Sequence, residues 1–242
     1  MTPVRVDLPV PTRVLAIGAH PDDIEFGCGA TLAKWADAGA EVHMCVCTDG
    51  SKGSWDTDAD PNALVATRET EQRDAAATLG AVDVHFLRFV DGELDNNLLA
   101  RAAVCALIRR ARPDVVVGHD PWQPYRLHPD HRRAGFLAID GIVAARDPHF
   151  FPEQGLAPHR PDTLLCFEPA RVAHLENVDG YVGRKVDALL AHRSQWRSTM
   201  GIAERPDEQR AAFVDRLHAE ARVNGLRGGC RAAEAFARID NL

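Results

Sequence analysis

The chain alternates between short apolar runs and longer stretches with helical spacing. Residues 14–19 read VLAIGA, a nearly continuous apolar run that is typical of a strand buried on both faces of a parallel sheet. Similar runs predict further strands at residues 42–47, 82–89, 114–118 and 163–167. Helical spacing with start and stop signals predicts helices at about residues 28–39, 63–79, 98–111, 182–192 and 207–223.

This order of elements predicts the fold class. Strands that alternate with helices imply βαβ crossovers, hence an α/β fold with a doubly wound, mostly parallel Rossmann-like sheet and helices on both faces. A length of 242 residues suits one such domain. We expect residues 1–146 to form the core and residues 147–242, where the pattern is harder to interpret, to form a C-terminal elaboration.

Two polar loops leave the carboxyl ends of predicted strands, where open α/β sheets bind ligands. Residues 19–25 read AHPDDIE, and the loop at residues 119–131 ends in HPDH. Together they supply the imidazoles and carboxylates of a catalytic zinc site, which needs three protein ligands and a free position for water. A third loop, residues 48–62, is long and rich in turn residues. This loop either covers the site as a lid or substrate loop, or it is a mobile surface loop that makes no contacts.

Composition and charge narrow the class of protein. Hydrophobic residues make up 45% and charged residues 26%, as in ordinary globular domains. A net charge of −7 argues against nucleic-acid binding and favours a small neutral substrate. Residues 1–10 lack the features of a secretory signal, and no run approaches the ~20 apolar residues of a membrane helix. We therefore expect a cytoplasmic protein that does not associate with a membrane.

The six cysteines show no CxxC spacing, in a chain too large to need disulfide staples. We expect reduced thiols in the core. Cys28 is the one candidate for an activated thiol, because it lies near the first polar loop and a presumed helix start.

The two loops and several shorter motifs resemble the PIG-L/LmbE-like family of zinc-dependent N-acetylglucosaminyl deacetylases. This family includes enzymes of the mycothiol and bacillithiol pathways and antibiotic-tailoring enzymes. The shorter matches are TDG at 48–50, RxxE at 68–71, DGEL at 91–94, HRSQ at 192–195 and AEAF at 233–236. The resemblance covers nearly the whole chain and implies a single LmbE-like domain whose C-terminal third shapes the substrate pocket.

The resemblance also implies a role for each residue of the two loops. His20, Asp23 and His131 would hold the metal, Asp22 would be the general base, and His128 would polarise the substrate carbonyl or protonate the leaving amine. Zinc would activate a water molecule and act as a Lewis acid. Iron(II) suits the same ligands. The implied reaction removes the acetyl group from an N-acetylglucosamine-type sugar or glycoconjugate by hydrolysis of its linear amide.

Four further residues are candidates for substrate binding. Arg68 would contact substrate hydroxyls or form an ion pair, and Trp122 would stack on a sugar ring or pack on its own loop. Glu25 would orient a ligand or cap the following helix. Asp130 would steer a metal-binding histidine or serve as an N-cap.

The remaining histidines carry weaker expectations. His119 follows a strand end and could touch the metal or the substrate. His43 and His85 fall inside strands, where we expect buried or half-exposed side chains without chemistry. His192 and Gln195 belong to a family motif whose spacing shows no chemistry.

Other functions fit the sequence less well. A dehydrogenase would need a GxGxxG turn where this chain has GAHPDD. A phosphoesterase with two metals would need more ligands than the single set of three. Two alternatives stay open: an amidase that cleaves a larger sugar-linked thiol conjugate, and a non-catalytic sugar-binding relative. A homo-oligomer is also possible.

Overall fold

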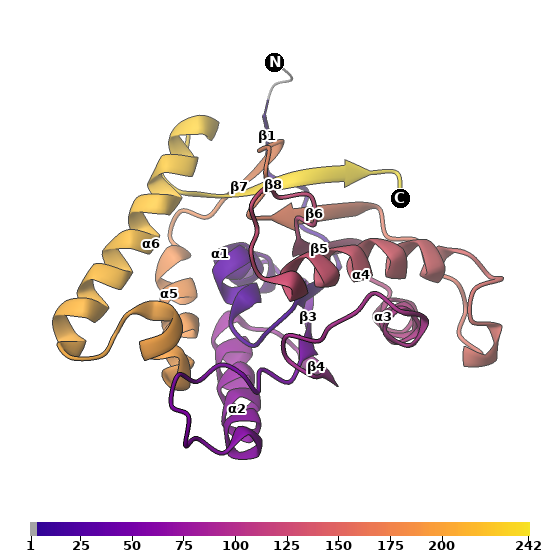
Figure 1. Cartoon of the computed structure of the whole chain (residues 1–242). Helices are drawn as coiled ribbons and strands as arrows, with labels where there is room; N and C mark the ends of the chain where they lie inside the picture. The colour runs from indigo at the N-terminus through magenta and orange to yellow at the C-terminus, as the bar shows by residue number, and fades with distance from the viewer. Residues whose placement is uncertain (1–3) are drawn as a thin grey trace.

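A computed structural model of the chain describes residues 4–242, in which eight strands form one sheet in the order β1-β7-β8-β6-β5-β2-β3-β4 (Figure 1). Residues 1–3, part of the N-terminal stretch considered above, lie outside this description. The strands are β1 Arg5–Val6, β2 Arg13–Gly18, β3 Glu41–Thr48, β4 Asp83–Phe89, β5 Val115–His119, β6 Thr163–Phe167, β7 His174–Asn177 and β8 Ala233–Asp240.

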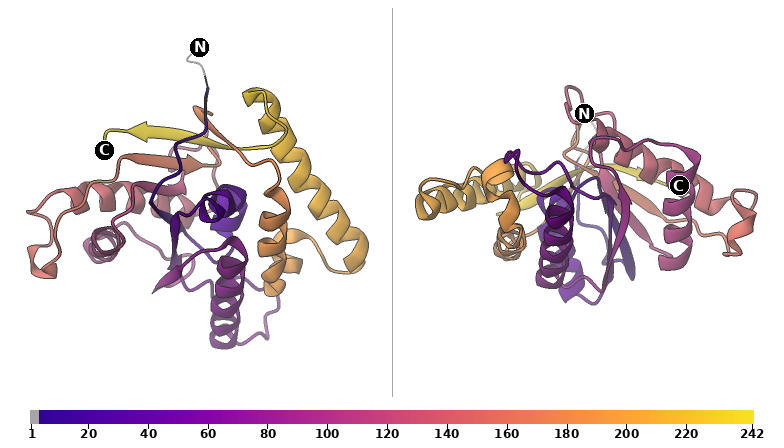
Figure 2. Two further views of the ribbon diagram at one scale, coloured as in Figure 1. Left: turned by 180° about the vertical axis from the view of Figure 1, so that it is seen from behind. Right: turned by 60° about the horizontal axis from the view of Figure 1, so that its bottom comes forward.

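Helices connect these strands, and Figure 2 shows them from two further sides. The α-helices are α1 Asp23–Asp37, α2 Pro61–Leu79, α3 Leu98–Ala111, α4 Pro129–Arg146, α5 Val182–Ala191 and α6 Pro206–Gly228, with short turns η1 Pro152–Gln154, η2 Arg193–Gln195 and η3 Trp196–Met200. Among these helices of residues 4–242, we find no segment that combines the length and apolar character of a membrane span.

The centre of the sheet is parallel and is buried on both faces. Strand β2 pairs in parallel with β3 and β5, and β5 pairs in parallel with β6. Leu15 and Ile17 of β2 pack into a core with α3 and α4, whereas Val14 and Ala16 pack on the other face with α1, α2 and α5. This two-sided burial explains the continuous apolar run, and the predicted α/β fold is confirmed.

Strand β8 pairs antiparallel with both β6 and β7, and we predicted neither β7 nor β8 from the sequence. Both strands carry buried polar residues that interrupt the apolar pattern. In β7, His174 Nε2 lies 2.6 Å from Glu176 Oε1, and neither residue is exposed. In β8, Glu234 is buried. The pairing of β8 with β6 and β7 defines these strands, and the spacing of apolar residues along the sequence does not reveal that pairing.

Helix α1 begins at Asp23, five residues before the start expected from the sequence. The segment shows no apolar stripe because nearly all of its first ten residues are buried, polar ones included. A kink at Cys28 (φ −151°, ψ 17°) divides the helix. Beyond the kink, the carboxylate of Glu234 accepts hydrogen bonds from the backbone N–H groups of Ala30 (3.2 Å) and Thr31 (2.8 Å). This cap comes from a residue some 200 positions away in the chain, so a local pattern could not indicate it.

Lys185 of α5 forms an ion pair with the capping carboxylate of Glu234. Its Nζ lies 2.7 Å from Glu234 Oε1 and donates a hydrogen bond to the carbonyl of Phe26 (2.7 Å). Burial lowers the pKa of Lys185, but the charge and hydrogen bond of Glu234 outweigh it and raise that pKa overall. The buried ion pair between Lys185 and Glu234 thus links α1, the helix that follows the AHPDDIE loop, to α5 and to the AEAF motif of β8.

The fold leaves no room for a side chain at Gly27. A Cβ atom there would lie 2.4 Å from the ring of Phe167, which is fully buried in β6. We expect Gly27→Ala to lower the free energy of unfolding by about 1–3 kcal/mol, the usual cost of overpacking. Urea denaturation would measure it.

Gly183→Ala is the matched control for this prediction. Gly183 is exposed in α5, and a Cβ atom there would meet nothing within 4 Å. The substitution should leave stability unchanged or raise it by up to ~1 kcal/mol, because alanine favours helix. Equal stabilities for the two variants would contradict the packing argument.

Candidate active site

The loop after β2 turns sharply so that His20 and Asp23 face the same space. The backbone N–H of His20 donates to Asp23 Oδ2 (2.7 Å), which closes the turn. Asp22 between them adopts φ 100°, a conformation that costs a non-glycine residue about 1–3 kcal/mol. Its N–H donates to the side-chain oxygen of Gln72 in α2 (3.0 Å). We expected both aspartates in a loop that continues to residue 25. Asp22 stands instead at this strained turn, and Asp23 is the first residue of α1.

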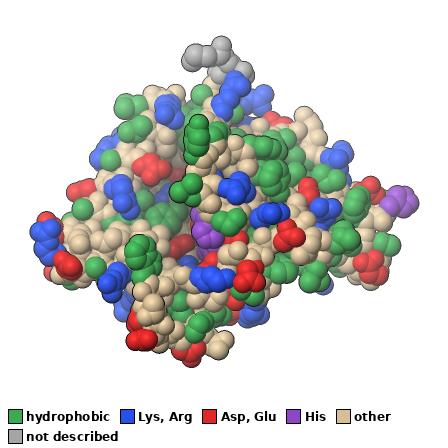
Figure 3. All heavy atoms as spheres, in the orientation of Figure 1, with side chains coloured by type: hydrophobic (Ala, Val, Ile, Leu, Met, Phe, Trp, Pro, Cys, Tyr) green, Lys and Arg blue, Asp and Glu red, His purple; other side chains and the backbone are tan. Residues whose placement is uncertain are grey.

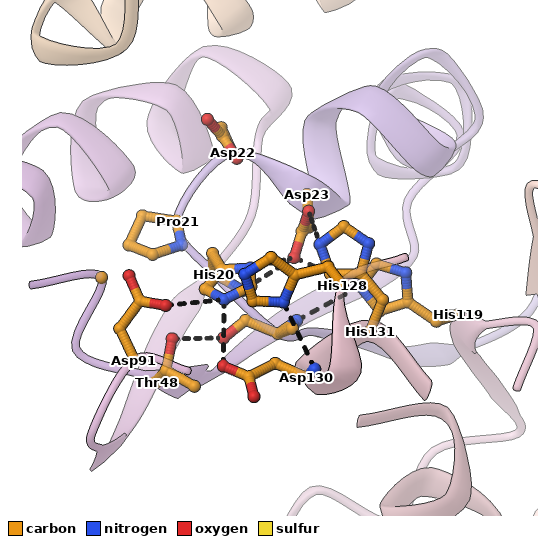
Figure 4. A network of polar contacts seen from close by, with 12 residues as sticks. His20, Pro21, Asp22, Asp23, Thr48, Asp91, His119, His128, Asp130 and His131 are labelled. Carbon is orange, nitrogen blue, oxygen red and sulfur yellow. Dashed lines mark hydrogen bonds and ion pairs between the residues drawn. The ribbon is translucent and has the colours of Figure 1, made fainter. Parts of the chain in front are cut away.

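The second segment follows β5 and ends at the start of α4. His128 is the N-cap of α4, and its Nδ1 accepts a hydrogen bond from the N–H of Asp130 (3.3 Å). The ring of His20 lies 4.5 Å from that of His128 and 5.2 Å from that of His131 between centroids. Figure 4 shows these imidazoles gathered from the two segments. The two polar loops therefore converge at the carboxyl edge of the sheet.

Asp23 lies between the other two predicted metal ligands. Its Oδ2 is 3.3 Å from His20 Nδ1, and its Oδ1 is 3.3 Å from His131 Nε2. His119 belongs to the same cluster, because its Nε2 is 3.2 Å from Asp23 Oδ2. Ring nitrogens of His20, His128 and His131 lie within 4.8 Å of one another, as do ligand atoms of Asp23, His119 and His131. The geometry offers more ligands than one metal needs.

Two more carboxylates hold the far side of the His20 ring. Its Nε2 is 3.2 Å from Asp91 Oδ1 and 3.2 Å from Asp130 Oδ2, which leaves Nδ1 directed toward Asp23. Burial alone would lower the pKa of His20, but its hydrogen bonds to Asp130, Asp23 and Asp91 raise it to about 12. Carboxylates behind a metal-binding imidazole fix its orientation and make it a better ligand.

These side chains fit a divalent transition metal. Imidazole nitrogens with one carboxylate form the usual ligand set of catalytic zinc. Burial, together with the neighbouring His119, His20 and Arg126, lowers the pKa of His131 to about 4 despite the opposing charge of Asp23. The ring is therefore neutral and has a lone pair. Oδ1 of Asp130 is buried without a hydrogen-bond partner, so a carboxylate oxygen behind His20 has no donor within the protein.

Asp22 faces away from the imidazoles in Figure 4. Its Oδ2 is buried without a hydrogen-bond partner, and the nearest cation is Arg68, with Nη2 at 3.7 Å. Burial raises the pKa of Asp22 to about 6, although the charge of Arg68 opposes the shift. Arg68 also donates to the carbonyls of Pro21 (2.6 Å) and Gly50 (3.0 Å), so it ties α2 to two of the polar loops.

A pocket of about 320 Å³ opens over this cluster, and Figure 3 shows histidine within a hollow bordered by charged side chains. Its walls come from both motif loops, from the loop at residues 48–62 and from the segment after α5. The lining residues are His20, Asp22, Asp23, Lys52, Gly53, Trp55, Arg68, Asp91, Gly92, His128, His131, Gln195, Ser198 and Thr199. The 48–62 loop therefore does contact the site.

Of the four substrate candidates, only Arg68 lines this pocket. Glu25 is fully buried beneath it and accepts a hydrogen bond from the amide of Gln72 (2.6 Å). Asp130 is also fully buried and contacts His20, which was one of the two alternatives given for it. Trp122 packs edge-on against Phe136, with ring centroids 5.9 Å apart.

Cys28 is not an activated thiol. It is fully buried and donates to the carbonyl of Ile24 (3.4 Å). Burial, reinforced by the charge of Glu234, raises its pKa well above the usual value.

Sequence reasoning did not single out Asp91, Gln72 or Arg126. Asp91 belongs to the DGEL motif, and its position just after the end of a predicted strand was the one feature of the sequence that indicated a role in the site. Gln72 gave no signal, because it lies inside a polar helix. Gln195, whose motif spacing indicated no chemistry, lines the pocket.

Arg126 bears directly on metal binding. Its Nη1 lies 2.9 Å from His131 Nδ1 and 3.2 Å from His119 Nδ1, while its Nη2 pairs with Glu168. Arginine only donates hydrogen bonds, so Nδ1 of His131 must accept here, and the ring proton sits on Nε2, facing Asp23. A metal ligand needs the lone pair on Nε2 and the proton on Nδ1, which opposes the contact with Arg126.

Comparison with known proteins shows the family of this chain. Residues 15–142 match the model of the PIG-L family, described as GlcNAc-PI de-N-acetylase. The chain belongs to the PIG-L family.

Two relatives illustrate the similarity in sequence. The chain is 35% identical to diacetylchitobiose deacetylase of Thermococcus kodakarensis, over 76% of this chain and 70% of the relative. It is 30% identical to 1D-myo-inositol 2-acetamido-2-deoxy-alpha-D-glucopyranoside deacetylase of Geodermatophilus obscurus, over 94% of this chain and 82% of the relative.

The fold is similar to a solved structure as well. N,N'-diacetylchitobiose deacetylase of Pyrococcus horikoshii superposes with a TM-score of 0.86 at 31% identity, covering 95% of this chain and 84% of that one.

The contact of Arg126 with His131 yields a prediction. In Arg126→Gln the side-chain oxygen can accept from a protonated Nδ1, so we expect zinc affinity to rise about tenfold, the value of one charged hydrogen bond. Competition with a chromophoric chelator measures this affinity. Arg210→Gln, an exposed arginine on α6, serves as control and should bind zinc like the parent protein. Unchanged affinity in Arg126→Gln would show that the contact does not oppose the metal.

Proposed function

We propose that the protein is a metal-dependent deacetylase that hydrolyses the acetamide of an N-acetylglucosamine-type sugar or glycoconjugate and releases acetate. The observation that carries the proposal is the position of Asp23, 3.3 Å from ring nitrogens of both His20 and His131, beneath a pocket that also contains Asp22 and His128. The relatives named as deacetylases of N-acetylated sugars support it.

In this proposal His20, Asp23 and His131 hold the metal, which is zinc or, with the same ligands, iron(II). The ion would supply Lewis acidity toward water and toward the amide carbonyl. Asp130 and Asp91 hold His20 in the orientation that metal binding needs. His119 contacts Asp23 from the other side and restrains the carboxylate.

Asp22 is the proposed general base. Asp22 lines the pocket, and its Oδ2 has no hydrogen-bond partner. A pKa near 6 leaves the carboxylate mostly ionised at neutral pH yet basic enough to accept a proton from water. Its strained backbone keeps it on the opposite side of the chain from Asp23. The two carboxylates can therefore have separate roles: Asp23 binds the metal, and Asp22 accepts the proton.

His128 is the proposed partner for the carbonyl oxygen or the leaving nitrogen. The N–H of Asp130 occupies its Nδ1, so the proton of the neutral ring sits on Nε2. From there it can donate a hydrogen bond into the pocket. Arg68 and Gln195 line the same pocket and supply donors for sugar hydroxyls.

A second hollow favours one alternative, an amidase that acts on a larger conjugate. This hollow, about 330 Å³, is lined by residues 123–128, His131 and Glu168, and shares His128 and His131 with the first. A bulky group attached to the sugar could occupy it while the same residues carry out the hydrolysis.

Asp22→Asn tests the mechanism. Asparagine keeps the shape but cannot accept a proton from water, so we expect kcat to fall by about 10²–10⁴-fold. Zinc content, measured by mass spectrometry, should stay at that of the parent. Asp187→Asn, an exposed aspartate on α5, should retain full activity. Near-full activity of Asp22→Asn would exclude Asp22 as the base.

Substrate choice separates the deacetylase from the amidase. We expect acetate release from N,N'-diacetylchitobiose or an N-acetylglucosaminyl inositol, with kcat/KM at least about 100-fold above that for bulky amides of the same sugars. Such a ratio corresponds to about 3 kcal/mol of transition-state discrimination. A preference for the bulky amides would support the alternative, and binding without any hydrolysis would contradict both.

A further inference from the structure

A second group of metal-binding side chains lies at the opposite end of the strands from the active site. His43 stands near the start of β3, and Asp83 and His85 stand at the start of β4. His43 and Asp83 are cross-strand partners, and His85 follows Asp83 by two residues, so all three project from one face. Thr48, whose N–H donates to the carbonyl of Ala19 at the active-site end of the sheet, lies five residue steps from His43. Five steps span about 16 Å of strand, which separates this group from the catalytic one.

The three side chains are already close enough to share an ion. One ligand atom from each lies within 4.8 Å of the others. Nε2 of His85 is 3.2 Å from Asp83 Oδ2, and the rings of His43 and His85 stack with centroids 6.2 Å apart and planes inclined by 21°. Ligands around one zinc ion lie at comparable separations, because each metal–ligand bond is about 2.0–2.2 Å long.

His43 stands beside the apolar core. The position next to His43 on β2 is Leu15, which is fully buried in the apolar core. Nδ1 of His43 is buried without a hydrogen-bond partner. Burial and the neighbouring His85 lower the pKa of His43, so the ring is neutral and can bind a metal. Glu41 adds negative charge nearby.

We propose that His43, Asp83 and His85 form a second binding site for a divalent transition metal, with zinc as the best match. Two imidazoles and one carboxylate suit zinc, whereas magnesium and calcium prefer oxygen ligands throughout. Strand β4 is the last in the sheet, and its pairing with β3 shifts register between Val46 and Thr48. A metal at this site clamps the edge strand to its only neighbour in the described sheet. The site is independent of the proposed deacetylase activity.

Zinc stoichiometry tests the proposal. Protein dialysed against micromolar free zinc is measured by mass spectrometry for the parent and for three variants. We expect two zinc ions per chain in the parent, one in His85→Ala and one in Asp23→Ala, which loses the catalytic ion. His149→Ala removes an exposed histidine elsewhere and should keep two. Two ions in His85→Ala, or one in the parent and none in Asp23→Ala, would overturn the second site.

The same series separates this inference from the proposed function. One ion in the parent, retained in Asp23→Ala and lost in His85→Ala, would support the second site and contradict the catalytic one. His85→Ala loaded with one zinc ion should deacetylate at the parental rate, since the residue lies outside the active site.

Asp83→Asn tests the second site should His85→Ala fail to fold, because Asp83 is exposed. We expect Asp83→Asn to bind the second zinc at least tenfold more weakly; parental affinity would count against the site.

Discussion

The active site depends on one constraint, which is that the carboxylate of Asp23 must reach two histidines from segments more than a hundred residues apart. Parallel strands meet this constraint because their carboxyl ends share one edge of the sheet. Strand β2 delivers His20 and Asp23 to that edge, and β5 delivers His119 and, through α4, His131. The apolar register between β2 and β5, Val14 with Val115 through Ile17 with Gly118, therefore sets the distances among these polar groups.

Backbone strain at Asp22 gives neighbouring aspartates different environments. A positive φ turns the chain between Asp22 and Asp23, so that one carboxylate points to the histidines and the other to Arg68. Gln72 and Arg68, both from α2, hold the turn through hydrogen bonds to the backbone of residues 21 and 22. The surrounding helix thus maintains a conformation that an isolated peptide would leave, which is typical of functional sites.

The sequence was sufficient for the central strands and for the two motif loops. Apolar runs marked β2, β3, β5 and β6 because both faces of these strands are buried. The run at β4 marked an edge strand whose residues are half-buried or exposed. The resemblance indicated the candidate ligands in the two loops. The sequence was insufficient for polar contacts that produce no periodic pattern. Glu234 caps α1 from some 200 residues away, and Arg126 contacts His131 from within an irregular loop. The division at residue 146, the cytoplasmic location and a homo-oligomer stay predictions.

The cap that Glu234 places on α1 has a consequence for biosynthesis. Strand β2 and the helix that begins at Asp23 are translated before β8, which follows them by some 200 residues. Until residues 233–240 have joined the sheet, the N–H groups beyond the kink at Cys28 lack their carboxylate acceptor. During synthesis, the helix that carries Asp23 can therefore gain this support only after β8 has been translated.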